Sequence, residues 1–141
     1  MTGKGTDAYL KTQIMTAPPE KLQLMLYNGA IRFATLGRAK MAEGDYEACH
    51  ELLMRAQNIV LELVCGLRPE HNPSLCNRMA ALYSFIYRRL VEANITHDPA
   101  AVADAVEILT VQRDIWLELL ERLAAERGAA EEMTMSVNAE A

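Results

Sequence analysis

The stretch from Glu20 to Arg32, EKLQLMLYNGAIR, decides the fold of the chain. Ten uncharged residues separate Lys21 from Arg32, which is too few to span a bilayer, where about 20 are needed. At about 100° per residue, however, apolar side chains fall on both sides of a helix formed by this stretch. One side can pack into a core, and the other side needs a second apolar surface to cover it.

The composition favours a single domain built from helices. The chain has 141 residues, of which 51% are hydrophobic and 23% charged, enough apolar material for one packed core. Aromatic residues are scarce at 6%, whereas Ala, Leu, Met and Glu, all good helix formers, are plentiful. We therefore expect an all-α protein that folds on its own.

The charge pattern argues against two classes of partner. The net charge is −5, and Arg88-Arg89 is the only adjacent basic pair, so the sequence lacks the basic stripe that neutralises nucleic-acid phosphates. The N-terminal sequence MTGKGTDAYLK has no apolar run of signal-peptide length, and no uncharged apolar run approaches a membrane span. We expect a cytoplasmic protein that binds no nucleic acid and does not insert into a membrane.

Prolines, glycines and capping residues divide the sequence into four helical blocks. Pro18-Pro19 suits the first turn of a helix, and Asp45 and Asp98 are typical N-caps. The predicted helices span residues 18–43, 45–67, 73–94 and 99–127. Residues 1–15 are expected to form a short N-terminal segment, and residues 128–141 a mobile tail. Amphipathic helices with short connections pack most simply as an antiparallel up-down four-helix bundle, which is the predicted fold.

Helical periodicity predicts which side of each helix faces the core. The predicted core stripe of the first helix is Leu22, Met25, Leu26, Gly29, Phe33, Leu36 and Gly37. In the second helix it is Cys49, Leu52, Leu53, Ala56, Ile59, Val60, Leu63, Val64 and Leu67. The third helix contributes Leu75, Met79, Leu82, Tyr83, Ile86 and Leu90, and the fourth Val102, Ala105, Val106, Leu109, Trp116, Leu120 and Leu123.

Two helices carry a further apolar stripe outside the predicted core stripe. The first helix has Leu24, Tyr27 and Ile31, and the fourth has Ile108, Val111, Ile115 and Leu119. A wide apolar arc is ordinary in a bundle, so these residues can simply be the edge of the core. If they are exposed, they form grooves that fit an amphipathic partner helix. An N-terminal segment containing Tyr9, Leu10 and Ile14 is a candidate internal cover for one groove.

Two long motifs resemble the FliS family of flagellar secretion chaperones. They are TAPPEKLQLMLYNGAIRF and LYSFIYRRLVEAN, with EGDYEA between them, and the resemblance runs in order from about Ala8 to Trp116. Tyr9 and Tyr27 match tyrosines of the family's N-terminal motifs. Pro18 stands where the family usually has Ser, and Asn28 where it usually has Asp, and neither departure affects the predicted fold.

The resemblance implies a function that periodicity alone does not name. It implies a four-helix bundle without catalytic activity that binds the disordered C-terminal segment of flagellin in the cytoplasm. Such a protein prevents premature filament assembly and helps to deliver flagellin to the export apparatus, whose components are further candidate partners. We predict contacts of this client with Leu24, Tyr27, Ile31, Ile108, Val111, Ile115 and Leu119.

Two other functions stay open at the level of sequence. A structural homodimer could use the extra stripes as its own interface. A metal-binding bundle is the weaker alternative, because Glu47-Ala48-Cys49-His50 is the only E-x-x-H and di-iron bundles need two copies. Cys65, His71 and Cys76 are too widely spaced for a typical zinc site. We expect no metal, no cofactor and no enzymatic activity.

Overall fold

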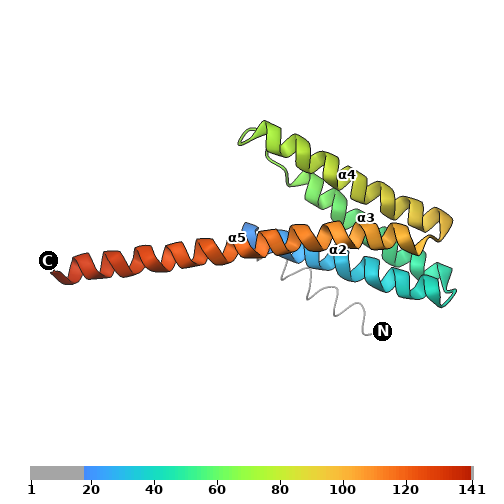
Figure 1. Ribbon diagram of the computed structural model, residues 1–141, viewed down its shortest axis with the longest axis horizontal. Helices are drawn as coiled ribbons and strands as arrows, with labels where there is room; N and C mark the ends of the chain where they lie inside the picture. The colour runs from blue at the N-terminus through green and yellow to red at the C-terminus, as the bar shows by residue number, and fades with distance from the viewer. Residues whose placement is uncertain (1–17, 141) are drawn as a thin grey trace.

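The computed structural model describes residues 18–140, which form four helices in an antiparallel up-down arrangement (Figure 1). The helices are α2 (Pro19–Ala42), α3 (Tyr46–Cys65), α4 (Pro73–Thr96) and α5 (Pro99–Glu140). α2 packs against α3 and α5, and α4 packs against the same two helices, so the four helices form a closed ring. The predicted all-α fold class is confirmed, and the described residues contain no strand.

The helix boundaries follow from capping chemistry. The Asp45 side chain accepts a hydrogen bond from the Ala48 backbone N–H at 3.2 Å, and Asn72 accepts one from Leu75 at 3.1 Å. Each satisfies a backbone donor that the first turn of a helix leaves unpaired. Gly44, in the connection between α2 and α3, has a φ of 78°, a conformation that costs glycine little.

The buried face of α2 differs from the predicted core stripe. Its buried residues are Tyr27, Ala30, Ala34, Gly37 and Met41, whereas Leu36, predicted to face the core, is 42% exposed. A Cβ atom built on Gly37 would lie only 2.9 Å from Leu53 Cδ2. Small residues on this face therefore let α2 approach α3 closely, a feature that a ranking by hydrophobicity overlooks.

The predicted core stripes of the other helices agree better with the structure. The fully buried side chains include Leu53, Val60 and Leu63 on α3, Ile86 and Leu90 on α4, and Val102, Ala105 and Leu109 on α5. All eight belong to the predicted stripes. Leu75 is the exception, because its side chain is 50% exposed near the start of α4.

The end of α5 is the main correction to the predicted element boundaries. The predicted end near Arg127 is wrong, because the helix continues through Gly128 to Glu140 and projects beyond the bundle (Figure 1). A glycine inside a helix costs only about 1 kcal/mol relative to alanine. No proline follows Gly128, and the next residues, AAEEM, are mostly good helix formers. The predicted tail at residues 128–141 is therefore helical as far as the structure describes it.

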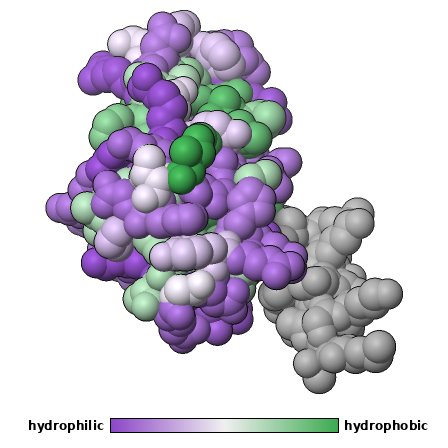
Figure 2. All heavy atoms as spheres, turned by 90° about the vertical axis from the view of Figure 1, so that its right-hand side faces the viewer, coloured by the Kyte–Doolittle hydropathy of each residue, from purple (hydrophilic) through white to green (hydrophobic). Residues whose placement is uncertain are grey.

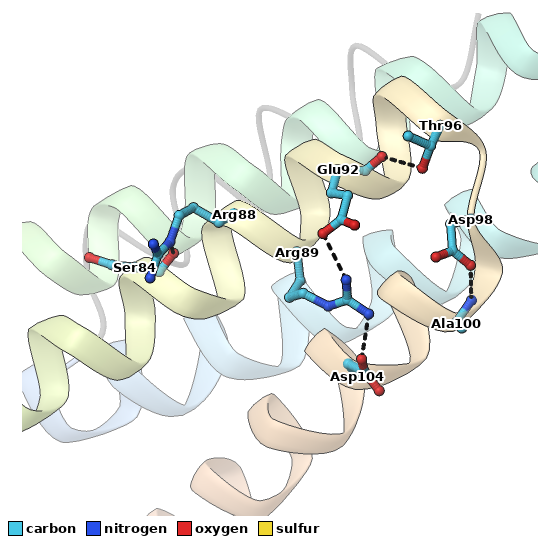
Figure 3. Close-up of polar contacts among 8 residues, drawn as sticks. All are labelled: Ser84, Arg88, Arg89, Glu92, Thr96, Asp98, Ala100 and Asp104. Atoms are coloured by element: carbon cyan, nitrogen blue, oxygen red, sulfur yellow. Dashed lines mark hydrogen bonds and ion pairs between the residues drawn. The ribbon is translucent and has the colours of Figure 1, made fainter.

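An ion-pair cluster fastens α4 to α5 near their connection. The Arg89 guanidinium lies between Glu92 of its own helix and Asp104 of α5 and pairs with both carboxylates (Figure 3). Asp104 and then Glu92 raise the pKa of Arg89, which stays charged. Nearby, the Asp98 side chain accepts a hydrogen bond from the Ala100 N–H and caps α5 (Figure 3). At their other ends, near the connection of α3 with α4, α4 and α5 diverge (Figure 1).

Candidate functional site

An apolar groove lies where α4 and α5 diverge, and we call it the open-end groove. Its volume is about 280 Å³. The lining residues come from three helices and from the connection after α3: Gln23 and Tyr27 of α2, Leu67 of the connection, Leu75, Met79 and Tyr83 of α4, and Gln112, Ile115 and Trp116 of α5. None of these side chains is charged, so the groove favours an apolar occupant.

The walls of the open-end groove combine exposed and anchored side chains. Leu75 on α4 and Ile115 on α5 are 50% and 56% exposed. Trp116 is fixed by a 2.9 Å hydrogen bond from its indole Nε1 to the Glu20 backbone oxygen, which ties α5 to the start of α2. The groove therefore has a rigid side and two large apolar side chains that solvent reaches.

The floor of the groove is a polar cluster of Gln23, Tyr27 and Tyr83. The two phenol oxygens lie 2.6 Å apart, across the bundle from α2 to α4. The Gln23 side-chain nitrogen lies 3.2 Å from the Tyr27 hydroxyl and 3.4 Å from the Tyr83 hydroxyl. Burial, followed by the hydrogen bond with Tyr27, raises the pKa of Tyr83, so its phenol keeps its proton.

An exposed apolar line continues from the groove along α5. Val111, Ile115 and Leu119 are 51%, 56% and 42% exposed, and their spacing of four residues places them on one face of the helix. A hollow of about 260 Å³ lies beside this line, between Ile115, Leu119 and the Glu118–Arg122 ion pair. We call Val111, Ile115 and Leu119 the α5 line.

The structure separates the predicted contact residues into three groups. Ile115 and Tyr27 line the open-end groove, and Val111 and Leu119 are exposed beside it. Ile31 and Ile108 are partly buried and pack against the core, and Leu24 is also partly buried. The predicted N-terminal cover, Tyr9, Leu10 and Ile14, lies outside the described residues.

The sequence leaves open whether Leu24, Tyr27 and Ile31 on α2 form the edge of the core or an exposed stripe, and the structure assigns the first of these to Tyr27. This side chain is only 2% exposed, because the small residues Ala30 and Ala34 turn its face of α2 toward the core. Tyr27 lies in the floor of the open-end groove, where a bound client could still reach its hydroxyl group. Its contact with the client stays a prediction. The exposed residues of the two predicted stripes therefore lie on α5, whereas Leu24 and Ile31 on α2 are partly buried.

Sequence reasoning misses the wall of the groove on α4 and its polar residues. Periodicity places Leu75 and Met79 in the core, but Leu75 is half-exposed, and Met79 both packs against the core and lines the groove where α4 diverges from α5. Gln23 lies in an apolar stretch of helix, and Gln112 has no distinguishing signal in the sequence. The divergence of two helices is a tertiary feature, and the periodicity of a single helix does not contain it.

A second hollow of about 300 Å³ lies between α3 and α4, and it includes Gln57 and Ile95. The Gln57 side chain is 5% exposed, and its oxygen has no hydrogen-bond partner. His50, the histidine of the E-x-x-H pattern, also lines this hollow, where its Nδ1 is 3.1 Å from the Asn94 side-chain oxygen. Within residues 18–140, no three His, Cys, Asp or Glu side chains gather as a metal site would require.

The opposite end of the bundle has a different character. Figure 2 shows that the end of the bundle carrying the α2–α3 and α4–α5 connections is mainly hydrophilic.

Burial, with a smaller effect of Asp45, raises the pKa of the Cys49 thiol, as expected of a packing residue, whereas Cys65 is exposed. None of the described helices has the length and apolar content to cross a bilayer.

Comparisons with known proteins agree on one family. The family model described as "Flagellar protein FliS" matches residues 2–123. The "Flagellar secretion chaperone FliS" of Bacillus subtilis (strain 168) is 39% identical over 114 residues, which cover 81% of this chain and 84% of the relative. The protein of the same name from Salmonella typhimurium is 29% identical and covers 84% of this chain and 91% of the relative.

A solved structure supports the same fold. The "Crystal structure of flagellar chaperone from bacteria" aligns with a TM-score of 0.69, covering 86% of this chain and 99% of that chain, at 21% identity. The likeness in structure concerns the fold alone, and the sequence matches carry the assignment. The chain therefore belongs to the FliS family of flagellar secretion chaperones.

Proposed function

We propose that this protein binds the C-terminal segment of flagellin in the cytoplasm, prevents its premature polymerisation and helps to deliver it to the export apparatus. Membership of the FliS family supports the client, and the open-end groove with the adjacent α5 line supports the place. The observation that carries the proposal is the uncharged apolar groove at the divergence of α4 and α5, continued by exposed side chains of the α5 line.

The groove and the α5 line together suit an amphipathic segment. Such a segment places anchors at positions i, i+3 or i+4, and i+7 against an apolar surface. Leu75 and Ile115 stand on opposite walls, so a helix lying between them would cover both. Covering the apolar face of the client removes the surface that another flagellin molecule would bind, which explains the block on polymerisation.

The energetics require more than the groove alone. Ordering a client segment costs about 1–2 kcal/mol per residue in backbone entropy. For a segment of about 20 residues, that cost is balanced by burying roughly 800–1,600 Å² of apolar surface at about 25 cal/mol per Å². We therefore propose that the client covers both the open-end groove and the α5 line, and that the net affinity stays low enough for release.

Calorimetric titration of the protein with a peptide of the flagellin C-terminal segment tests the function. We expect a one-to-one complex with a negative heat-capacity change, because apolar surface is buried on binding. A peptide from the middle of flagellin serves as the control. Absence of binding by the C-terminal peptide would overturn the proposed client.

The substitution Ile115→Glu tests the location. Ile115 is 56% exposed, so we expect the melting temperature to change little. Placing a charge against the apolar face of the client should weaken binding by about tenfold or more.

Ile95→Glu is the matched control, since Ile95 is 74% exposed and lies beside the hollow between α3 and α4. We expect this variant to bind the peptide as the parent does. Equal losses in both variants, or no loss in either, would contradict the proposed location.

The alternative of a structural homodimer rests on the same exposed side chains of the α5 line. Light scattering of the free protein and of its one-to-one complex with the peptide distinguishes the structural homodimer from the flagellin-binding chaperone. A dimer that dissociates when the peptide binds would show that both partners compete for the α5 line.

A further inference from the structure

The polar cluster in the floor of the open-end groove has more hydrogen-bond donors than its internal contacts can use. Each of the two phenols supplies one hydrogen, and the Gln23 amide supplies two. The cluster contains three contacts, between Gln23 and Tyr27, between Gln23 and Tyr83, and between the two phenols. At least one donor is therefore left over.

This surplus does not depend on how the Gln23 amide is oriented. In the orientation given by the contacts, the amide nitrogen donates to both phenols, one phenol donates to the other, and one phenolic hydrogen remains. If the amide were turned over, its oxygen would accept that hydrogen, and the two N–H groups would remain. Both arrangements leave at least one donor without a hydrogen bond inside the cluster.

The surroundings of the cluster offer no obvious partner for the remaining donor. Leu67, Leu75, Met79, Ile115 and Trp116 supply mainly apolar surface to the lining of the groove. Gln112 also lines it, but no hydrogen bond joins Gln112 to the cluster within residues 18–140. In the free protein, water can satisfy a donor at the edge of the groove. A client that displaces this water must replace its hydrogen bond or lose affinity.

The lining residues also limit which groups of the client can accept this hydrogen bond. A carboxylate buried in a groove without a cation would lose its hydration and gain no counter-charge. None of the lining residues is Lys, Arg or His. The uncharged lining therefore favours a neutral acceptor over a carboxylate, and an amide carbonyl, from either an Asn or Gln side chain or an unpaired backbone carbonyl group, is such an acceptor.

We propose that Gln23, Tyr27 and Tyr83 act together as a specificity site that donates a hydrogen bond to an amide carbonyl of the bound flagellin segment. This inference rests on the proposed function and adds a polar requirement to an otherwise apolar groove. The raised pKa of Tyr83 is consistent with it, because the phenol remains a donor at every physiological pH. A segment that is only apolar would leave the donor buried and unpaired.

The combined variant Gln23→Leu, Tyr27→Phe and Tyr83→Phe provides a test, because the two explanations of the groove predict different changes in peptide affinity. It removes all four polar hydrogens and makes the floor of the groove apolar at similar volume. If the groove contributes only apolar contacts, the flagellin peptide should bind this variant as tightly as the parent or more tightly. If the cluster donates to a carbonyl, binding should weaken by about tenfold, because the client acceptor loses its partner.

Folding of the variant is checked by its melting temperature, and Tyr83→Phe alone is the second variant if the triple variant unfolds. For the single variant we expect a smaller loss of about threefold, since Gln23 and Tyr27 can still donate. Unchanged or tighter binding by a folded variant would overturn the specificity site.

A second peptide, in which every Asn and Gln is replaced by Leu, identifies the source of the carbonyl. If a side-chain amide is the acceptor, this peptide should bind the parent about tenfold more weakly and should no longer distinguish the parent from the triple variant. If a backbone carbonyl is the acceptor, the tenfold difference between the two proteins should persist. Failure of the original peptide to bind the parent protein would overturn the proposed function, whereas equal binding to parent and triple variant would overturn only this inference.

Discussion

Gln57 is a buried polar residue whose side chain destabilises the folded protein. It is 5% exposed on α3, and its side-chain oxygen has no hydrogen-bond partner. A buried amide oxygen without a partner costs about 1–3 kcal/mol of desolvation, a cost that an apolar side chain of similar size would avoid. Gln57 therefore lowers the free energy of unfolding of the protein.

The substitution Gln57→Met is expected to raise the free energy of unfolding by about 0.5–1.5 kcal/mol. Met and Gln are similar in length and in helix propensity, so the change mainly removes the unpaired amide. Urea denaturation at neutral pH measures the effect. Asn58→Met, on the exposed side of α3, is the control and should change stability by less than about 0.5 kcal/mol. A loss of stability in the Gln57→Met variant would show that the amide is paired with water.

The helices are predictable from sequence to different degrees. α3 is predicted well, because its core positions carry large apolar residues such as Leu53 and Val60, whose spacing reveals the buried face. α2 is not, because alanines and a glycine define its buried face, and a small residue gives no strong apolar signal. The end of α5 is predicted too early because Gly128 is typical of a helix stop, although helix formers follow it.

The last part of α5 should contribute helix content without contributing to the stability of the bundle. From Ala125 onward nearly all described side chains are exposed. We expect truncation after Arg127 to reduce the helical signal in circular dichroism and to shift the free energy of unfolding by less than about 0.5 kcal/mol.

Truncation after Leu119 is the matched control for this helix. It also removes Leu120 and Leu123, which are partly buried and border a hollow with Pro18 and Lys21 at the start of α2. This shorter variant should lose about 2 kcal/mol or more. Destabilisation of similar size by both truncations would mean that the end of α5 packs against the bundle.

The candidate site is a property of the whole molecule, which explains why only part of it can be predicted from the sequence. Periodicity identifies Ile115 and its neighbours on the α5 line as apolar residues outside the core stripe, and the structure places them at the surface. The opposite wall depends on the divergence of α4 from α5, while Arg89 and Asp104 hold the other ends of the two helices together. No single segment encodes that geometry.

Occupation of the groove should stabilise the folded bundle by mass action. A client that binds only the folded state adds about 2.7 kcal/mol at a concentration of 100 times its dissociation constant. We expect saturating flagellin peptide to raise the melting temperature by roughly 5–10 °C, measured by differential scanning calorimetry. The Ile115→Glu variant should show a much smaller rise at the same peptide concentration. An equal rise in both proteins would indicate that the peptide binds elsewhere.

The projecting end of α5 has a consequence for how the size of this protein is measured. At about 1.5 Å per residue, the helix from Ala125 to Glu140 reaches roughly 24 Å, farther than the radius of gyration of about 14 Å expected for a compact protein of this length. Such a rod increases hydrodynamic friction, so a monomer should elute from gel filtration at the volume of a heavier globular protein. An apparent dimer on a calibrated column would then reflect shape, and removing the rod should shift elution by more than the lost mass accounts for.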